Sequence, residues 1–250
     1  MTGWLVPVIF VIALVYASVG HAGATGYIAA MTLAGLAPEV IRPTALVLNV
    51  GVATIATMQF ARAGHLRRDL VVPLAAGGVP AAFVGGAIGL HPAVFEAVVG
   101  VVLAVSALRF AALAVTPGRP TVESCGRRLG RMPLVVLGVV LGLLAGLTGV
   151  GGGVFLTPAL VALGGGPLRE IAAASAAFIL ANSLAGLGGG FVVGRAFPAV
   201  DMAAVVAALI GGAVGSHLGA FRLPVRALEG LVGVVLAVAA IRLLAPFAGS

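Results

Sequence analysis

The chain has 250 residues, of which 61% are hydrophobic and only 8% carry a charge. A soluble domain carries roughly 25% charged residues, so this sequence lacks the polar groups that cover a water-facing surface. We therefore predict an all-α integral membrane protein and exclude soluble enzymes as a class. All fourteen basic residues are Arg. A chain without Lys can hold neither a Schiff base nor a Walker A phosphate loop, which excludes ATP-driven transport by this chain alone.

Ten apolar runs follow one another along the chain, and each is expected to form a helix in the membrane. A helix needs about 20 residues to span the bilayer, and three runs in each half approach or exceed that length. We treat the first run as a retained helix rather than a signal peptide, because no basic segment precedes it. The runs comprise residues 4–19, 25–36, 43–61, 70–90, 92–115, 133–147, 154–163, 171–193, 200–219 and 228–247.

The two sets of five runs have the same order of lengths, which indicates an internal duplication. The clearest match joins residues 96–109 (EAVVGVVLAVSALR) to 229–242 (EGLVGVVLAVAAIR), where ten of fourteen positions are identical. We predict two transmembrane repeats, residues 1–115 and 133–250, joined by a basic linker at 116–132. Each repeat is expected to hold a pair of short helices interrupted by glycine, followed by three long spans.

The arginines predict which loops face the cytoplasm, because cytoplasmic loops of membrane proteins are enriched in basic residues. The linker contains four arginines and the gap at 62–69 contains three, so both are expected inside. The gap at 39–42 has no net charge and is expected outside. In the second half, three arginines oppose two and do not decide the topology. Run 154–163 is too short to span the membrane, so the short pair is expected to form a hairpin that does not cross. Three long spans remain in each repeat, and this odd number of crossings favours inverted repeats. If the pair instead crosses the membrane once, the repeats are parallel.

Glycine interrupts the first apolar pair of each half, at residues 20–26 and 146–153. Unwound backbone leaves N–H and C=O groups unpaired at a cost of several kcal/mol each in lipid, so it survives only inside protein or beside a wet cavity. Paired breaks in two repeats point to a transporter's substrate site, and the helix that starts after each break offers N–H groups to an anion. Close helix packing through small residues is the alternative. That packing role is expected for a further set, Gly85, Gly86, Gly211 and Gly212.

Polar residues near the breaks favour an anion as the substrate. None of the seven acidic residues lies in the middle of a span, whereas cation pumps and proton antiporters usually keep a buried carboxylate. Asn49 and Asn182 lie at equivalent places in the two repeats, where a buried amide either clamps broken backbone or faces a ligand. Thr25 and Thr148 flank the breaks and can donate hydroxyl hydrogen bonds to an oxyanion. His21 lies inside the first break, where it can contact substrate or carry a proton.

The predicted substrate site combines these side chains with glycine backbone. Its members are Gly20, His21, Gly23, Thr25, Asn49, Thr148, Gly149, Gly151, Gly152 and Asn182. We predict no cofactor and no metal site, because four scattered histidines and the single Cys125 share no ligand spacing. Ser18 and His21 would make a nucleophile and a base, but intramembrane hydrolysis needs more than one such pair. No catalytic residue is therefore assigned.

Two stretches resemble a known family. They are SVGHAGATGYIAAMTLAGLAPEVIRPTALVLN at residues 18–49 and GLLAGLTGVGGGVFLTPALVALGGGPLREIAAASAAFILANS at residues 142–183. In both, and in length and duplicated halves, the chain is similar to the sulfite exporter TauE/SafE family. In the first stretch, Ala22 and Ala24 stand where the family commonly has glycine, and His21 replaces a small residue. The resemblance implies a multi-pass carrier of sulfur-containing anions, such as sulfite or organosulfonates, usually in the export direction.

We therefore predict a secondary transporter that holds a small sulfur-containing oxyanion between the two glycine breaks and exports it while the repeats rock around it. Its partners are this anion and the lipid bilayer, without nucleic acid, and the sequence leaves open whether the chain forms a homodimer. We expect a multi-pass protein of a cell membrane, such as the bacterial inner membrane. The alternatives are a carrier of a cation or a neutral solute, and a non-transport intramembrane protein.

Overall fold

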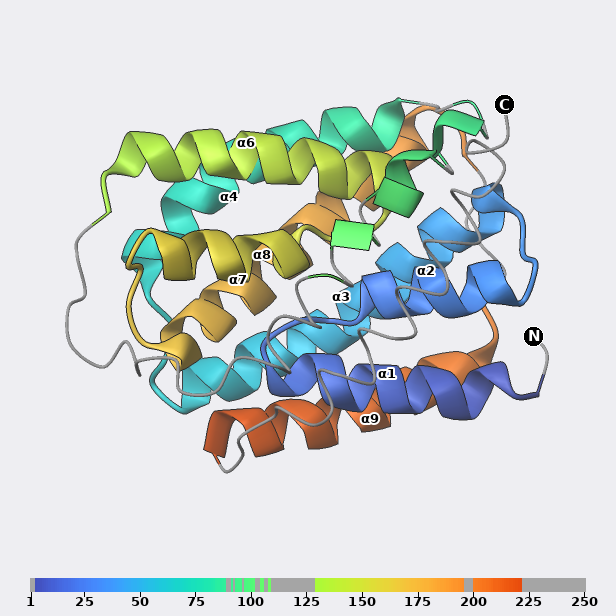
Figure 1. Ribbon diagram of the computed structural model, residues 1–250, viewed down its shortest axis with the longest axis horizontal. Coiled ribbons are helices and arrows are strands. Elements are labelled where there is room, and N and C mark those ends of the chain that lie inside the picture. Colours follow the sequence, from blue (N-terminus) through green and yellow to red (C-terminus); the bar gives the residue numbers. More distant parts are fainter. Residues whose placement is uncertain are drawn as a thin grey trace.

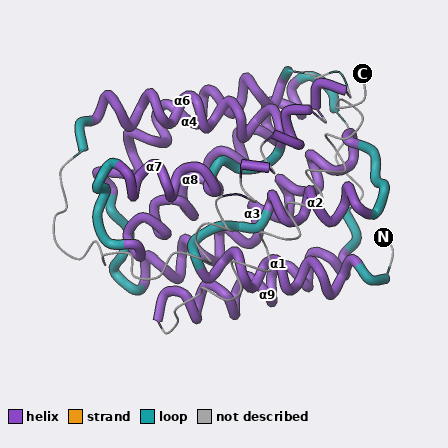
Figure 2. The backbone as a smooth tube through the Cα atoms, viewed as in Figure 1, coloured by secondary structure: helices purple, strands orange, loops and turns teal. Residues whose placement is uncertain are grey.

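The computed structural model describes residues 3–88, 91, 93–95, 97–101, 104–105, 108, 129–195 and 200–221. All regular structure in these ranges is helical, with no strand (Figure 2), which confirms the all-helical part of the predicted fold class. Much of the expected run 92–115, most of the linker and the whole run 228–247 lie outside the described residues. The helices are α1 (Leu5–Ser18), α2 (Ala24–Leu33), α3 (Pro38–Arg62), α4 (Arg68–Ala87), α6 (Arg131–Thr148), α7 (Gly153–Ala162), α8 (Leu168–Val192) and α9 (Met202–Phe221).

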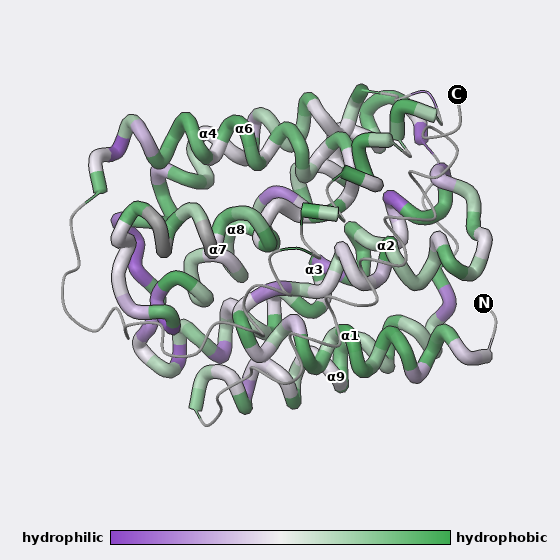
Figure 3. Tube along the Cα trace, viewed as in Figure 1, coloured by the Kyte–Doolittle hydropathy of each residue, from purple (hydrophilic) through white to green (hydrophobic). Residues whose placement is uncertain are grey.

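Five of these helices, α3, α4, α6, α8 and α9, are long and apolar enough to cross a membrane. The chain is therefore a multi-pass membrane protein. Helices α1, α2 and α7 are shorter, with 14, 10 and 10 residues, whereas α6 reaches spanning length with 18 residues. Hydrophobic residues continue onto the outside of the bundle (Figure 3). Val72, Phe191 and Met202, for example, are 63%, 68% and 70% exposed, which suits contact with lipid.

The helices run in two opposite directions along the long axis of the molecule (Figure 1). Arg67 Nη1, just before α4, lies 3.2 Å from Glu170 Oε2 at the start of α8. Arg195 Nη2, just after α8, lies 3.4 Å from the Ala87 carbonyl oxygen at the end of α4. Helices α4 and α8 are therefore parallel, and α6 runs with them, while α1, α3 and α9 run the other way (Figure 1).

Rows of glycine bring helices from the two halves of the chain into backbone contact. Three glycines at four-residue spacing on α6 lie against α4, and three at the same spacing on α9 lie against α1. A Cβ on any of the six would overlap a backbone carbonyl oxygen of the partner helix, and small residues allow such close packing in membranes. The rows are Gly138, Gly142 and Gly146 on α6, and Gly211, Gly215 and Gly219 on α9. Each half contributes its first helix to such a contact. Helix α1 of the first half packs on α9 of the second, and α6 of the second half packs on α4 of the first.

Helices α3 and α8 form the centre of the bundle. Their spanning windows are 50% and 61% buried, against 39% to 44% for α4, α6 and α9. The two helices contact each other, and each also packs on the short helix that precedes it, α2 or α7. Any site next to both short helices therefore lies beside the most buried part of the protein.

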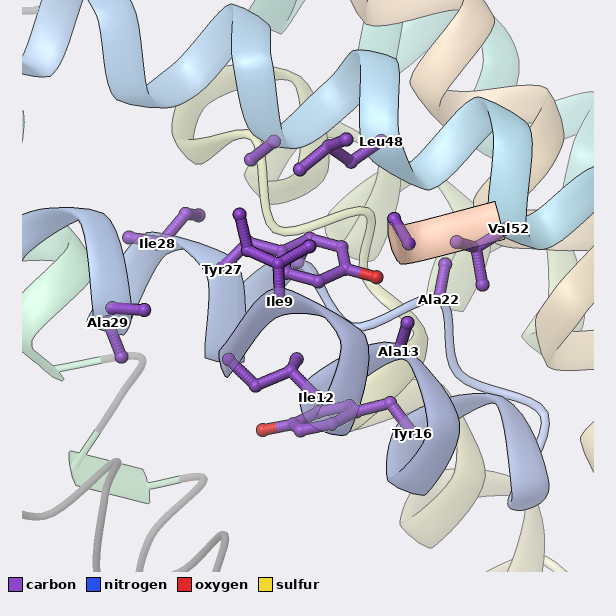
Figure 4. Close-up of a cluster of buried hydrophobic side chains, with 14 of the residues drawn as sticks. Ile9, Ile12, Ala13, Tyr16, Ala22, Tyr27, Ile28, Ala29, Leu48 and Val52 are labelled. Atoms are coloured by element: carbon purple, nitrogen blue, oxygen red, sulfur yellow. The ribbon is translucent and has the colours of Figure 1, made fainter. Parts of the chain in front are cut away.

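An apolar cluster holds α2 against α1 and α3. In Figure 4, the ring of Tyr27 lies among buried side chains that include Ile9 and Leu48. Gly26 packs on α1, since a Cβ there would lie 2.6 Å from Cγ2 of Ile12. This close approach allows α2 to turn back along α1, so the chain enters and leaves the pair at the same end of the bundle (Figure 1).

Candidate functional site

Two loops that contain glycines with positive φ interrupt the chain inside the bundle. The first glycine loop, residues 19–23, joins α1 to α2, and the second glycine loop, residues 149–152, joins α6 to α7. Gly20 and Gly23 have φ angles of 78° and 101°, and three glycines of the second loop have φ angles of 77° or 79°. This left-handed conformation is strained for residues with a Cβ. Glycine therefore allows the chain to end one helix and start the next within a few residues.

The first glycine loop is connected to the second half of the chain through His21. This side chain is 2% exposed, and its Nδ1 lies 3.2 Å from the Val19 carbonyl oxygen. Its Nε2 lies 3.2 Å from the Thr157 hydroxyl on α7, which lies 3.0 Å from the Ser175 hydroxyl on α8. The loop thus holds a buried imidazole in a chain of polar contacts that crosses between the halves.

The second glycine loop lies beside Asn49 of α3. A Cβ on Gly151 would lie 2.6 Å from Asn49 Nδ2, so glycine leaves room for the amide. That amide is buried and donates to the Ser183 hydroxyl on α8 at 3.5 Å, which is a weak hydrogen bond. A Cβ on Gly153, the first residue of α7, would lie 3.5 Å from His21 Cδ2. The two glycine loops therefore approach each other at the N-terminus of α7.

Several buried polar atoms in this region have no hydrogen-bond partner among the described residues. They are Asn49 Oδ1, both amide atoms of Asn182 and Thr44 Oγ1, and these residues are at most 1% exposed. Asn182 lies one turn beyond Phe178 on α8, and a Cβ on Gly152 would lie 3.1 Å from the Phe178 ring. An unpaired buried polar group costs about 1–3 kcal/mol. Such groups are suited to complete their bonding with a ligand or with water.

The two threonines of the predicted site use their hydroxyl protons inside the protein. Thr148 donates to the Leu144 carbonyl oxygen at 2.6 Å and accepts from the Val150 N–H at 3.3 Å, which shapes the end of α6. Thr25 donates to the Tyr16 hydroxyl at 3.0 Å. Donation from either threonine to a bound anion therefore requires a change of side-chain rotamer.

Arg42 also lies at the second glycine loop, although the sequence placed it in an outer gap. It is 8% exposed and is the one charged side chain that is buried among the described residues. Its Nη1 and Nη2 atoms donate to four backbone carbonyl oxygens. The acceptors are Ile88 (3.2 Å), Gly85 (2.7 Å), Gly86 (2.9 Å) and Gly146. Arg42 thus joins the ends of α4 and α6, and the end of α6 leads directly into the second glycine loop.

The observed start of α3 explains why Arg42 was not among the predicted site residues. The apolar run 43–61 predicted a helix that starts after the arginine, whereas α3 begins at Pro38. A proline is well tolerated there, because the first N–H groups of a helix have no intrahelical partner. Arg42 therefore lies one turn inside the helix. The signal that could have identified it is its position, directly before the long apolar run 43–61 that follows the first glycine break.

Ser18 and His21 do not form a nucleophile–base pair in this structure. Ser18 donates to the Val15 carbonyl oxygen of its own helix at 2.6 Å, while the ring nitrogens of His21 face Val19 and Thr157. Within the described ranges, no group of three or more His, Cys, Asp or Glu side chains could hold a metal ion. The loop region therefore presents glycine backbone, buried amides, one imidazole and one guanidinium.

An ion-pair cluster lies at the end of the bundle that holds most of the described arginines. Arg67 bonds to Asp69 beside it, and to Glu170 and the Gly165 carbonyl oxygen from the second half. The hydrogen bond to Asp69 is the main cause that raises the pKa of Arg67 above its usual value, so this side chain stays charged at physiological pH. A partly exposed pair contributes no more than about 1 kcal/mol, but this one links the two halves.

Most of the chain matches a known family, described as sulfite exporter TauE/SafE, over residues 5–243. The chain belongs to this family. The probable membrane transporter protein y4hK of Sinorhizobium fredii is 38% identical over 243 residues, which cover 94% of this chain and 95% of y4hK. The probable membrane transporter protein MamO of Magnetospirillum gryphiswaldense is 28% identical over 255 residues, which cover 86% of this chain and 40% of MamO. No solved structure matches the chain.

The match confirms the family that the glycine-rich stretches predicted. It identifies this TauE/SafE protein as a membrane transporter. The matched range includes both glycine loops and all eight of the helices described above, so the candidate site lies within the part of the chain that defines the family.

Proposed function

We propose that this TauE/SafE family member is a secondary transporter that exports a small sulfur-containing oxyanion, sulfite or an organosulfonate, across a cell membrane such as the bacterial inner membrane. The choice of substrate and direction follows the description of the family. The observation that carries the proposal is that Arg42 is buried beside the second glycine loop, while no acidic side chain is buried among the described residues. These surroundings favour an anion over a cation or a proton.

The anion is held between the two glycine loops, at the N-termini of α2 and α7. The first N–H groups of a helix have no partner within it and, with the positive end of the helix dipole, they attract anions. The side-chain amides of Asn49 and Asn182 add N–H donors from the two central helices, and that of Asn182 has no partner among the described residues. Neutral donors of this kind suit an oxyanion, which offers only acceptor oxygens.

The two halves, residues 1–115 and 133–250, act as inverted repeats around this site. In support, α2 and α7 have 10 residues each, α3 and α8 have 25 each, and α4 and α9 have 20 each. The corresponding long helices also run in opposite directions (Figure 1). Inverted repeats give alternating access when one half rocks against the other.

Uptake of radiolabelled sulfite into proteoliposomes tests this proposal, with Gly151→Leu as the site variant. We expect transport by this variant to fall to background, because a Cβ at Gly151 already lies 2.6 Å from Asn49 Nδ2. Gly64→Leu is the matched control. Gly64 has a φ of 79°, close to the 77° of Gly151, but nothing lies within 4 Å of a Cβ there, so this variant should retain most of the transport.

Two results would contradict the proposal. The first is a wild-type protein that moves no sulfite or sulfonate, and the second is equal transport by the two leucine variants. Inhibition by cations rather than by competing anions would instead favour a cation carrier.

A further inference from the structure

Arg42 is a cation in the interior of a membrane protein, and none of its described hydrogen bonds goes to a carboxylate. All four go to neutral backbone carbonyl oxygens, which solvate the charge but do not cancel it. A guanidinium does not lose its proton in proteins, and a charge within the bilayer is costly unless it has a countercharge or a function. The buried charge of Arg42 therefore calls for an anion.

The backbone and the side-chain stem of Arg42 lie against the second glycine loop, and its guanidinium bonds to the end of the helix that leads into that loop. A Cβ on Gly149, the first residue of that loop, would lie 2.9 Å from the Arg42 carbonyl oxygen and 3.1 Å from Arg42 Cγ. The carbonyl oxygen of Gly146, which accepts from Nη2, comes from the last turn of α6 before the loop. The Nε–H of Arg42 has no acceptor among the described residues. The loop region thus has both a fixed charge and a spare donor beside it.

The first glycine loop shows that the packing itself does not require a charge. Gly20 lies against the backbone of Ala172 on α8, much as Gly149 lies against Arg42 on α3. The central helix α8 presents small apolar residues there, Ala172 and Ala173, and both are buried. A glycine loop can therefore pack against a central helix that has no arginine there. The role of Arg42 is not explained by packing of the loop.

We propose that Arg42 is a specificity-determining residue whose fixed charge selects anions at the second glycine loop and favours a dianion over a monoanion. This inference rests on the proposed anion transport and names the group that reads the charge of the substrate. A bound anion supplies the countercharge that Arg42 lacks, and the attraction grows with the charge of the anion. The four carbonyl bonds hold the guanidinium in position, so the field is present before the substrate arrives.

Two substitutions separate the charge of Arg42 from its hydrogen bonds. Arg42→Lys keeps the charge but loses the planar fork that serves several acceptors, while Arg42→Gln keeps an amide donor and loses the charge. The readout is KM in proteoliposomes for sulfite at alkaline pH, where it is a dianion, and for ethanesulfonate, a monoanion. In Arg42→Gln we expect KM to rise at least about tenfold more for the dianion than for the monoanion. In Arg42→Lys the ratio of the two KM values should change less than about threefold.

A ratio of KM values that is unchanged in Arg42→Gln, or that changes equally in both variants, overturns the inference, because a clamp for α4 and α6 does not distinguish substrates by charge. If size-exclusion chromatography shows that Arg42→Gln does not fold, the wild type decides. Its KM should be lower for the dianion than for the monoanion, and a KM for the dianion that is equal or higher overturns the inference. Absence of anion flux in the wild type overturns the proposed function as well. Wild-type flux together with a ratio of KM values that is unchanged in Arg42→Gln overturns only this inference.

Discussion

The two glycine loops share a backbone design and differ in their chemistry. Each joins two helices through glycines with positive φ and packs against one turn of a central helix. The first loop carries its own polar side chain, His21, which contacts Thr157 of the other half. The second loop has no polar side chain of its own and lies against Arg42, again from the other half. Glycine backbone thus sets the shape of both loops. The basic side chain at each loop, His21 or Arg42, belongs to the first half and makes contacts with the second half.

The two loops therefore differ in the kind of basic side chain that each brings to the interior of the bundle. An imidazole can change its charge near neutral pH, whereas a guanidinium cannot. The first loop therefore carries an imidazole, and the second lies beside a residue of constant charge. Variants that act on one loop at a time can test this division.

The largest expected effect is on folding, at Gly20 of the first loop. A Cβ there would overlap the backbone of Ala172, in addition to the strain of a φ of 78°. We expect Gly20→Ala to lower the free energy of unfolding by about 3 kcal/mol or more. At Gly152 of the second loop, φ is 77° but the nearest neighbouring atoms would lie 3.1 Å away, so Gly152→Ala should cost about half as much.

Denaturation in detergent measures both losses of stability. Gly35→Ala is the control, because Gly35 has a φ of 77° and nothing lies within 4 Å of a Cβ there. It reports the cost of the backbone conformation alone. Equal losses at Gly20, Gly152 and Gly35 would show that the contact between Gly20 and α8 contributes nothing.

A second effect, on transport rather than folding, is expected at Asn182 near the second loop. Both of its amide atoms lack a partner among the described residues, so Asn182→Leu should leave the free energy of unfolding unchanged or raise it by about 1 kcal/mol. Sulfite uptake by the same variant should fall at least about tenfold, by loss of a hydrogen bond to the substrate.

Ser216→Ala is the matched control for Asn182→Leu. It removes a buried hydroxyl that lies 3.1 Å from Gln59 Oε1 and 2.6 Å from the Gly212 carbonyl oxygen, and neither of these partners belongs to a glycine loop. This variant should lose about 1 kcal/mol of stability and keep its transport. Melting temperature and uptake are measured for both variants, and normal uptake by a folded Asn182→Leu protein would remove Asn182 from the site.

The smallest expected effect is the coupling between His21 of the first loop and Thr157 on α7. Their 3.2 Å contact predicts that His21→Gln and Thr157→Val are not additive in stability, with a coupling of about 1 kcal/mol. The pair of His21→Gln with Ser216→Ala serves as the uncoupled reference. Additive losses in the His21 and Thr157 pair would mean that the first loop is not held to the second half by this contact.

The helices and part of the glycine packing were predictable from the sequence, because both follow directly from local composition. Helices α4 and α8 begin and end within three residues of the apolar runs 70–90 and 171–193. The packing role expected for Gly86 and Gly211 was also correct, since a Cβ on either would overlap the backbone of another helix.

The polar contacts of the site were not predictable, because they depend on partners from distant parts of the chain or on the choice of a side-chain rotamer. The carbonyl oxygens that accept from Arg42 belong to residues as far as 104 positions away, and only the packing of α4 on α6 brings them together. The hydroxyl of Thr148 turns to a carbonyl of its own helix, a rotamer choice that residue type alone does not decide. A buried arginine and an inward-turned hydroxyl depend on three-dimensional arrangement, whereas helices depend on hydropathy.

The contact of α1 with α9 also sets an order for biogenesis. Phe10 lies near the start of the chain, and its carbonyl oxygen faces Gly211, near the end of the described residues. During synthesis, α1 enters the bilayer long before α9 has been translated, so the surface of α1 that packs on the α9 glycines stays uncovered until α9 follows. Such distant closures slow folding. A chain that stops before α9 therefore exposes the surface of α1 that α9 covers in the folded protein.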